Sequence, residues 1–391
     1  MTADAVHTID AFIVTIPRDT PYLGALGPGE RVNERGYFVR ARNRTVYPAM
    51  DRSILLRVTT KSGATGWGET YGLIAPRATT EILLDLFAPF VIGREPHDAA
   101  AIHDDLRDLM RVRGCAGGYY GDALAAIDIA LWDLSAKLAG VSLAQHLGGR
   151  RRERIPAYVS GLPEPTLAAR VKLAASFAVK GFKNFKFAAA VSECGEIEEL
   201  AALRAALGPE AGIAVDLHWR YTAGESLALA NRLAPGRPLF IEAPVSPDDI
   251  AGLREVCAQS PVPVAAGEEW FSAHEFRNRL PGPSILQPEM GHTGVTEFLR
   301  IAELARGQGL RLMPHATIGL GIFLAASLQV CASLEAETLH EYQHSVFDAN
   351  LRYLQGDLRM DRTAYAVPAG PGLGVSPNDA VWDYAIQCST V

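Results

Sequence analysis

The 391-residue sequence is poor in cysteine and contains no long apolar run, and both shortages exclude classes of protein. Its five cysteines are scattered and form no C-x-x-C pair, so we expect reduced thiols and neither a disulfide framework nor a zinc site. No stretch approaches the roughly 20 apolar residues of a membrane helix. The N-terminus, MTADAVHTID, lacks the charged and apolar regions of a signal peptide. These absences predict a cytoplasmic protein without a membrane partner.

Basic residues are also outnumbered: the chain has 37 Lys and Arg and 44 Asp and Glu, which gives a net charge of −7. The one basic run, GRRRER at 149–154, is typical of a solvated connector. Without a broad basic field, a nucleic-acid partner is not expected. Hydrophobic residues make up 48% of the chain and charged residues 21%, which is the composition of a globular protein with a large core.

The first third of the chain predicts an α+β unit. Residues 6–16 and 53–60 are rich in β-forming side chains, and the Gly-containing KSGATGWGET that follows predicts a turn and a returning strand. The polar segment 22–50 is a long loop, which in a compact domain is either functional or disordered. Apolar residues at helical spacing predict amphipathic helices at 78–92, 97–112 and 122–139.

From about residue 156 short apolar strands alternate with helical segments, the pattern of parallel βαβ units. One ionisable residue stands at the end of each strand, and successive ones are 30, 26, 26, 21, 26 and 26 positions apart. In a closed (β/α)8 barrel those strand ends meet at one mouth, whereas an open sheet would spread them along a crevice. We therefore predict an α/β fold with a TIM-type barrel. The seven residues are Lys186, Asp216, Glu242, Glu268, Glu289, His315 and Glu341.

Three consecutive strands end in a carboxylate: Asp216, Glu242 and Glu268. Brought together, these acids would repel one another unless a cation compensates their charge. An all-oxygen ligand set favours Mg2+ or Mn2+ over zinc. The alternative is that each acid is a separate surface residue or helix cap, which is less consistent with their regular spacing. Glu269, next to Glu268, should point away and is not assigned to the metal.

The next two strand ends, Glu289 and His315, predict a general base, because a carboxylate can orient an imidazole and raise its basicity. The alternative for His315 is a hydrogen-bonded structural histidine. His218 shares a strand face with Asp216, since side chains alternate with period two. His218 could donate a proton to a leaving group or simply cap the next helix.

In this order the segments resemble the enolase superfamily, specifically acid-sugar dehydratase-like members of its mandelate racemase/muconate lactonizing enzyme family. GFKNFKF is similar to the second-strand lysine motif, and HEY to the eighth strand. VDLH, FIEAP and AAGEEW are similar to the metal-ligand strands, and LQPEMGHTGVTE and MPHATIG to the dyad strands. The resemblance covers nearly the whole chain. It implies a modified, enolase-like barrel at 136–365 and an α+β capping domain at 1–135 that the C-terminal segment 366–391 completes.

The resemblance also implies roles for the site residues. His315 would remove the proton α to a substrate carboxylate, and Glu289 would orient it. Lys186 and Glu341 would bind that carboxylate. One Mg2+ per active site, replaceable by Mn2+, would have three protein ligands: Asp216, Glu242 and Glu268.

Two positions depart from the family pattern. The second strand often carries K-x-K, but here Lys186 is followed at the second position by Ala188, which cannot accept a proton. A racemase needs a base on each face of the substrate, so Ala188 counts against racemisation and also against the cycloisomerases. The acid that orients the base is usually aspartate, and here it is Glu289. A D-x-H pair at Asp216 and His218 resembles dehydratases in which this histidine protonates the departing hydroxyl.

We therefore expect a hydro-lyase that removes water from an aldonate or aldarate, such as a galactarate-, galactonate- or gluconate-like acid, and yields a 2-keto-3-deoxy acid. Three alternatives stay open: a racemase or epimerase of a 2-hydroxy acid, a Schiff-base aldolase using Lys186, and a non-catalytic sugar-acid binder. The expected partner is a small sugar acid, and relatives suggest a homo-oligomer. Arginines and tyrosines of the 22–50 loop could contact the substrate or be solvated; the candidates are Arg40, Arg42 and Tyr47.

Overall fold

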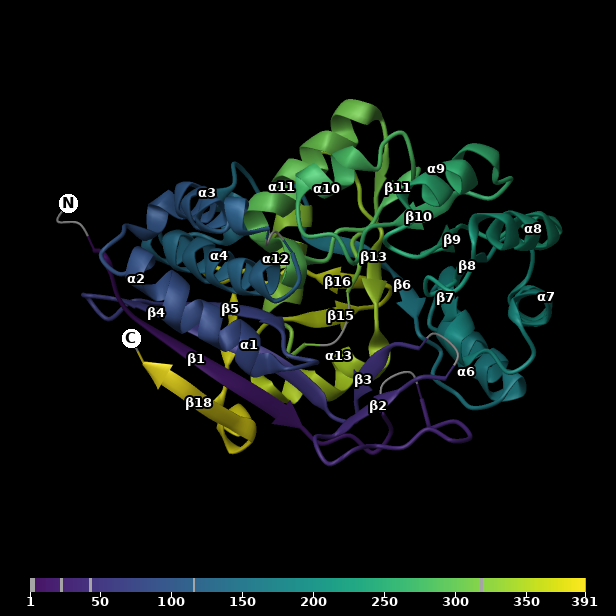
Figure 1. Cartoon of the computed structure of the whole chain (residues 1–391), viewed down its shortest axis with the longest axis horizontal. Coiled ribbons are helices and arrows are strands. Elements are labelled where there is room, and N and C mark those ends of the chain that lie inside the picture. The colour runs from purple at the N-terminus through teal and green to yellow at the C-terminus, as the bar shows by residue number, and fades with distance from the viewer. Residues whose placement is uncertain (1–3, 22–23, 42–43, 115–116, 317–318, 391) are drawn as a thin grey trace.

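The computed structural model describes residues 4–21, 24–41, 44–114, 117–316 and 319–390. The N-terminal part contains an antiparallel sheet in the order β18-β1-β4-β5. The strands predicted at 6–16 and 53–60 are present, as is the returning strand, and the C-terminal β18 pairs with β1. Figure 1 shows this cap beside the barrel, with the two ends of the chain on the cap side. The bounds are β1 Val6–Ile16, β4 Asp51–Thr60, β5 Thr65–Tyr71 and β18 Ala385–Thr390.

Helices cover one face of the cap sheet, and the long α4 (Tyr119–Leu138) is buried on nearly all sides. Two glycines of β5 allow this close packing, because a Cβ at Gly66 or Gly68 would clash with backbone carbonyl oxygens of α4. The segment predicted as one helix at 78–92 is helical without a break from residue 76 to residue 91, and its middle part is a π-helix. The other helices of the cap are α1 Pro76–Glu81, η1 Ile82–Phe87, α2 Ala88–Val91, η2 Pro96–Asp98, α3 Ala99–Leu109 and η3 Arg111–Arg113.

Eight parallel strands form the barrel, in chain order from β6 to β12, and β13 pairs with β6. A hydrogen bond from the Glu341 N–H to the Pro314 carbonyl (3.3 Å) joins the eighth strand to the seventh, so the ring closes. The predicted barrel is confirmed. The strands are β6 Arg154–Ser160, β7 Asn184–Ala188, β8 Gly212–Asp216, β9 Ile241–Glu242, β10 Val264–Ala266, β11 Ile285–Leu286, β12 Arg311–Leu312 and β13 His340–Tyr342.

Helices follow the barrel strands and pack outside them, as βαβ connections require (Figure 1). The outward-facing apolar residues of the strands share a continuous core with these helices, and the inward-facing ones form a separate small cluster inside the barrel. They are α5 Leu143–His146, α6 Leu167–Val179, η4 Ala189–Val191, α7 Glu196–Leu207, α8 Ala223–Leu233, η5 Ala234–Gly236, α9 Ile250–Gln259, α10 Ala273–Asn278, α11 Met290–Gln308, α12 Ile322–Ser333, α13 His344–Asn350 and η6 Leu351–Tyr353.

Short strands complete the structure at its margins. The hairpin of β15 and β16 extends the start of β6 antiparallel, and β2 pairs with β3 inside the long 22–50 loop. The remaining elements are β2 Tyr37–Val39, β3 Val46–Pro48, β14 Leu354–Gly356, β15 Arg359–Asp361, β16 Ala364–Ala366, β17 Val375–Pro377 and η7 Asp379–Tyr384. No helix within the described ranges has both the length and the apolar character needed to cross a bilayer.

Cap and barrel are joined by buried hydrogen bonds. Asp128 of α4 accepts bonds from the backbone N–H and the hydroxyl of Thr296 in α11, at 2.8 and 2.6 Å. Glu69 of β5 accepts bonds from backbone N–H groups at the start of α12, from Leu320 to Phe323. The helix α4 continues across the expected domain limit at residue 135, and the domain limits stay a prediction.

Candidate active site

The strand ends do converge. In the parallel register Ser160 lies beside Lys186, Ala188 beside Asp216, and Asp216 beside Glu242, so polar side chains of consecutive strands reach the same level of the barrel. Six of the seven strand-end residues are buried, as is His218, and the seventh, Glu268, keeps 17% of its side chain exposed. Glu289, which follows β11, forms a parallel β-bridge with His315, which follows β12. Regular spacing along the chain has therefore become one compact polar cluster.

Lys186 is the positive centre of this cluster. Its Nζ lies 2.5 Å from Glu242 Oε1 and 3.0 Å from Glu341 Oε1. Burial alone lowers the pKa of Lys186, but the charges of Glu242 and Glu341 outweigh it and hold the pKa well above its usual value. The amine is therefore an ammonium group that can donate hydrogen bonds to a carboxylate. An ammonium group is not a nucleophile, which argues against a Schiff base at this lysine.

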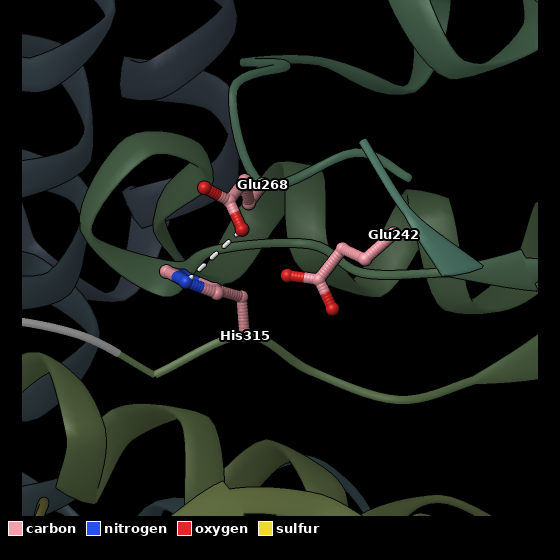
Figure 2. A group of neighbouring side chains, drawn as sticks. All are labelled: Glu242, Glu268 and His315. Atoms are coloured by element: carbon pink, nitrogen blue, oxygen red, sulfur yellow. Dashed lines mark ion pairs between the residues drawn. The ribbon is translucent and has the colours of Figure 1, made fainter. Parts of the chain in front are cut away.

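Two of the predicted metal ligands, Glu242 and Glu268, come together with His315. Each of the three offers a ligand atom, and these atoms lie within 4.8 Å of one another (Figure 2). The His315 Nε2 is 3.1 Å from Glu268 Oε2. Burial raises the pKa of Glu268 well above its usual value, His315 opposes this rise, and Glu242 and Asp216 add to it. Buried oxygen donors with this excess negative charge fit a divalent cation.

Asp216 lies at the edge of this set. One carboxylate oxygen accepts a 3.0 Å hydrogen bond from the backbone N–H of His218, and the other is 3.8 Å from Lys186 Nζ. Burial raises the pKa of Asp216, but His218 and Lys186 outweigh it and lower the pKa. Asp216 is thus a ready anionic ligand, although His315 takes the third place beside Glu242 and Glu268 in this arrangement. The ligand triad that includes Asp216 stays a prediction.

The predicted pair of Glu289 and His315 is in contact, with 2.8 Å between Oε2 and Nδ1. The other oxygen of Glu289 accepts a 3.0 Å bond from the Gly291 N–H, which fixes the carboxylate at the start of α11. The extra methylene relative to aspartate therefore does not break the contact. Burial lowers the pKa of His315, but Glu268, Glu341 and Glu289 outweigh it and raise the pKa to about 10.

His218 stands where β8 turns away from the barrel. His218 and Trp219 both have left-handed backbone conformations, with φ of 50° and 54°, which cost on the order of 1–3 kcal/mol each. The turn is held by the Trp219 N–H, which donates to the Ala243 carbonyl at 2.8 Å. The His218 Nδ1 lies 3.0 Å from Asp216 Oδ1. Backbone strain at this point aims the imidazole toward the acidic cluster.

A cavity of about 280 Å³ opens onto the cluster between cap and barrel. His218, Glu268 and His315 line it from the barrel, and Tyr47 lines it from the 22–50 loop. Glu269 lines it too, with Oε1 bound by Trp219 Nε1 at 3.2 Å, so the expectation that Glu269 points away was wrong. The other lining residues are Thr45, Val46, Tyr71, Leu73, Ile74, Tyr119, Asp122, Trp219 and His292.

The arginines of the loop are placed differently. Arg40 is buried, its Nη1 lies 2.8 Å from Glu30 Oε2, and it donates to the carbonyls of Gly24 and Ala25. It lines a separate cavity of about 760 Å³ beside the barrel mouth. The guanidinium therefore organises the loop, and its contact with a substrate stays a prediction. Arg42 lies outside the described residues.

Two features of the site were not anticipated. Gln287 Nε2 donates a 2.6 Å hydrogen bond to Glu242 Oε2, and His292 Nδ1 lies 2.6 Å from Asp122 Oδ1. The position of Gln287, two residues before Glu289 on one strand face, was a usable signal. The second pair joins residues 170 positions apart and left no signal in the sequence.

The fold and the site define a capped (β/α)-barrel protein with an acidic mouth. Residues 169–381 match the family described as enolase C-terminal domain-like, and residues 42–148 match the mandelate racemase/muconate lactonizing enzyme N-terminal domain. The chain belongs to the mandelate racemase/muconate lactonizing enzyme family of the enolase superfamily.

Relatives in this family carry several names. A D-galactonate dehydratase of Ralstonia nicotianae is 33% identical over 86% of this chain and 92% of its own. A D-galactarolactone cycloisomerase of Agrobacterium fabrum is 31% identical over 85% of this chain and 90% of its own. A structure from Sinorhizobium meliloti, provisionally described as an isomerase, is 54% identical with a TM-score of 0.96, covering 98% of this chain and all of its own.

Proposed function

We propose that this protein is a Mg2+-dependent acid-sugar dehydratase that acts on an aldonate or aldarate. The observation that carries the proposal is the pairing of His315 with Glu289 beside the carboxylates of Glu242 and Glu268. A base held by a carboxylate next to a cation site is what removal of an α-proton from a carboxylate requires. The name of the Ralstonia relative supports water loss as the outcome.

Each residue of the cluster has a role in this reaction. The Lys186 ammonium donates hydrogen bonds to the substrate carboxylate, and Glu341, 3.0 Å away, holds the ammonium in place. Glu268 is the strongest of the charges that raise the pKa of His315, so a cation held by Glu268 would lower that pKa and leave Nε2 free to remove the α-proton. Glu289 stabilises the imidazolium that results. His218, fixed by Asp216, donates a proton to the β-hydroxyl, so the C–O bond breaks as water leaves. The enol product then becomes a 2-keto-3-deoxy acid.

Asp216, Glu242 and Glu268 would hold the Mg2+. When bound, Mg2+ supplies positive charge next to the substrate carboxylate, which makes the α-proton more acidic. These acids fit this ion for two reasons. The cluster contains more carboxylates than the positive charges of Lys186 and His315 can neutralise. Burial also raises the pKa of Glu268, so a bound cation would stabilise its ionised form. Mn2+, which accepts the same oxygen ligands, is an expected substitute.

A second candidate is an isomerase that opens a sugar lactone, in which the leaving oxygen stays attached to the product. The name of the Agrobacterium relative favours it, and the description of the Sinorhizobium structure as an isomerase is compatible with it. It begins with the same α-proton removal, and Ala188 excludes only a lysine as the second base. A racemase or epimerase needs a base opposite His315, and a non-catalytic binder has no use for the Glu289 pair.

The test is a screen of sugar monoacids, diacids and their lactones with Mg2+, read by semicarbazide for 2-keto acids and by mass. Dehydration gives a keto acid lighter than the substrate by one water, whereas lactone isomerisation leaves the mass unchanged. Dehydration of an aldonate or aldarate supports the proposal. Turnover of lactones alone would replace it with the second candidate, and turnover of none would refute both.

The cellular setting is proposed on sequence grounds. The scattered cysteines favour a reducing compartment, and Cys194, Cys257, Cys331 and Cys388 are free in the structure. We propose a cytoplasmic homo-oligomer that meets its sugar acid as a small free solute, without a nucleic-acid or membrane partner.

A further inference from the structure

A second carboxylate-oriented histidine lies on the cavity described above. His292, in the first turn of α11, has its Nδ1 2.6 Å from Oδ1 of Asp122 in the cap helix α4. Both residues line the cavity that His218, Glu268 and His315 line from the barrel side. We infer that His292, oriented by Asp122, binds the hydroxyl groups of the sugar acid that are remote from its carboxylate. This inference rests on the proposed function and names the residue that selects the polyol chain.

The His292 ring is held in one orientation. It stacks on Tyr71 with 4.1 Å between ring centroids and 16° between planes, and Phe271 lies at 4.6 Å on a tilted approach. Asp122 is almost fully buried and its carboxylate accepts a hydrogen bond from Nδ1–H, so Nε2 is the ring nitrogen that remains for a ligand. Within the described part of the chain Nε2 has no hydrogen-bond partner, and the side chain keeps 16% of its surface exposed.

The cavity walls separate the two ends of a substrate. Lys186, which binds the carboxylate in the proposed reaction, and Glu341, which holds its ammonium in place, are both buried and do not line this cavity. His292 lines it together with the cap residues Asp122, Tyr47 and Tyr71. A six-carbon acid that is anchored at Lys186 and extends past His315 into this cavity brings its far hydroxyls to His292. A substrate hydroxyl can donate to Nε2 while Asp122 keeps the proton on Nδ1.

If His292 only held the cap against the barrel, its replacement would have a different effect from the loss of a substrate contact. Such a structural loss would weaken every reaction of the enzyme alike. Loss of a polyol contact affects only acids that possess distal hydroxyls. The truncated substrate glycerate has the carboxylate, the α-proton and the α- and β-hydroxyls but no hydroxyl beyond the β-carbon, so it separates the two roles.

The experiment compares His292→Phe with the wild type, both loaded with Mg2+. The phenyl ring keeps the stacking on Tyr71 and removes both nitrogens. His146→Phe is the matched control, because His146 also bonds a side chain of α4, Ser135, and packs on an aromatic ring but does not line the cavity. The readouts are calorimetric affinity and α-proton exchange in D2O, each measured for galactonate and for glycerate.

We expect His292→Phe to lower affinity and exchange with galactonate roughly 10- to 100-fold, as loss of a hydrogen bond in a polar site does. Values for glycerate, and both values for His146→Phe, should stay within about 2-fold of wild type. Asp122→Asn, which keeps an acceptor for Nδ1–H, should lower the galactonate values less, and it serves if His292→Phe does not fold.

Equal losses for galactonate and glycerate, or no loss for either, would overturn the inference and leave the proposed function standing. A wild-type enzyme that binds and exchanges neither acid, nor any other sugar acid in the screen, would overturn the proposed function and the inference with it.

Discussion

Gln287 and Glu242 are joined by a hydrogen bond of 2.6 Å, from the amide Nε2 to the carboxylate Oε2, inside the barrel mouth. The other oxygen of Glu242 is 2.5 Å from Lys186 Nζ. The amide and the ammonium together hold this carboxylate in one orientation. Partners of this kind behind a metal ligand typically contribute 10- to 100-fold in metal affinity.

We therefore predict that Gln287→Leu weakens Mg2+ binding by about 10-fold or more, because Glu242 loses the donor that orients it. The measurement is a calorimetric titration of metal-free protein with Mg2+. Gln329→Leu is the control, since Gln329 is an equally buried glutamine whose hydrogen bonds go to backbone groups of Ala144 and Pro368 and to none of the acids. A Gln287→Leu protein that binds Mg2+ as the control does would show that Gln287 plays no part in the metal site.

Replacing His218 should separate proton removal from water loss. His218→Asn keeps a polar side chain at the strained turn but cannot donate a proton as an acid. Dehydration should fall by about 100-fold or more, while exchange of the α-proton with D2O persists, because His315 is untouched. Proton NMR of one sugar acid in D2O follows both events. Loss of exchange together with dehydration would remove His218 from the leaving-group role.

The bond between cap and barrel at Glu69 should matter for stability. Its carboxylate accepts from the backbone N–H groups of four consecutive residues and from the Ser53 hydroxyl. Glu69→Ala should lower the free energy of unfolding by about 3 kcal/mol or more, because buried donors lose their acceptor. Denaturant titration measures this change. An effect below about 1 kcal/mol would mean that water or nearby groups replace the carboxylate.

The strand-end residues could be predicted from the sequence because parallel strands place their carboxyl ends at one mouth, whatever the helices between them. The positions of Lys186, Glu242 and His315 followed from this rule. The rule says nothing about which direction a side chain takes beyond the strand. Glu269 therefore turned into the cavity against expectation, where Trp219 binds it.

Long-range partners were beyond prediction for a related reason. From the sequence alone, Arg40 is expected to be solvated or to bind the substrate. In the structure the folded loop places Glu30 against its guanidinium. His292 meets Asp122 only because α11 packs on α4, and this packing depends on side-chain shapes of two domains. The periodicity of a sequence describes one helix or strand at a time. A contact between two side chains of different elements depends on how those elements pack against each other, which periodicity does not show.

Stability should also depend on pH through His340. This histidine is fully buried, accepts the Ser327 hydroxyl at Nε2 and donates from Nδ1 to the Glu341 carbonyl. Burial lowers its pKa from 6.5 to about 4. Between these two pH values the unfolded chain binds more protons than the folded one. The contribution of neutral His340 to the free energy of unfolding is therefore fully present above pH 6.5 and decreases as the pH falls toward 4.

The total loss from His340 is on the order of 3 kcal/mol. Unfolding titrations from pH 4.5 to 8 (roughly the range of the transition) measure it. His340→Phe should be less stable at neutral pH but should show a flatter pH dependence. His97→Phe is the control, because His97 lies on the surface with 68% of its side chain exposed. An unchanged slope in His340→Phe would assign the pH dependence to other groups.

Anomalous diffraction from a Mn2+-loaded crystal tests most directly whether Asp216, Glu242 and Glu268 bind one common metal ion. We predict one strong peak per chain in the barrel mouth, about 2.1 Å from carboxylate oxygens of Asp216, Glu242 and Glu268, with His315 released from Glu268 and bound only to Glu289. No peak among these three carboxylates, or a peak bound by His315 in place of Asp216, would contradict the assignment of His315 as the free base.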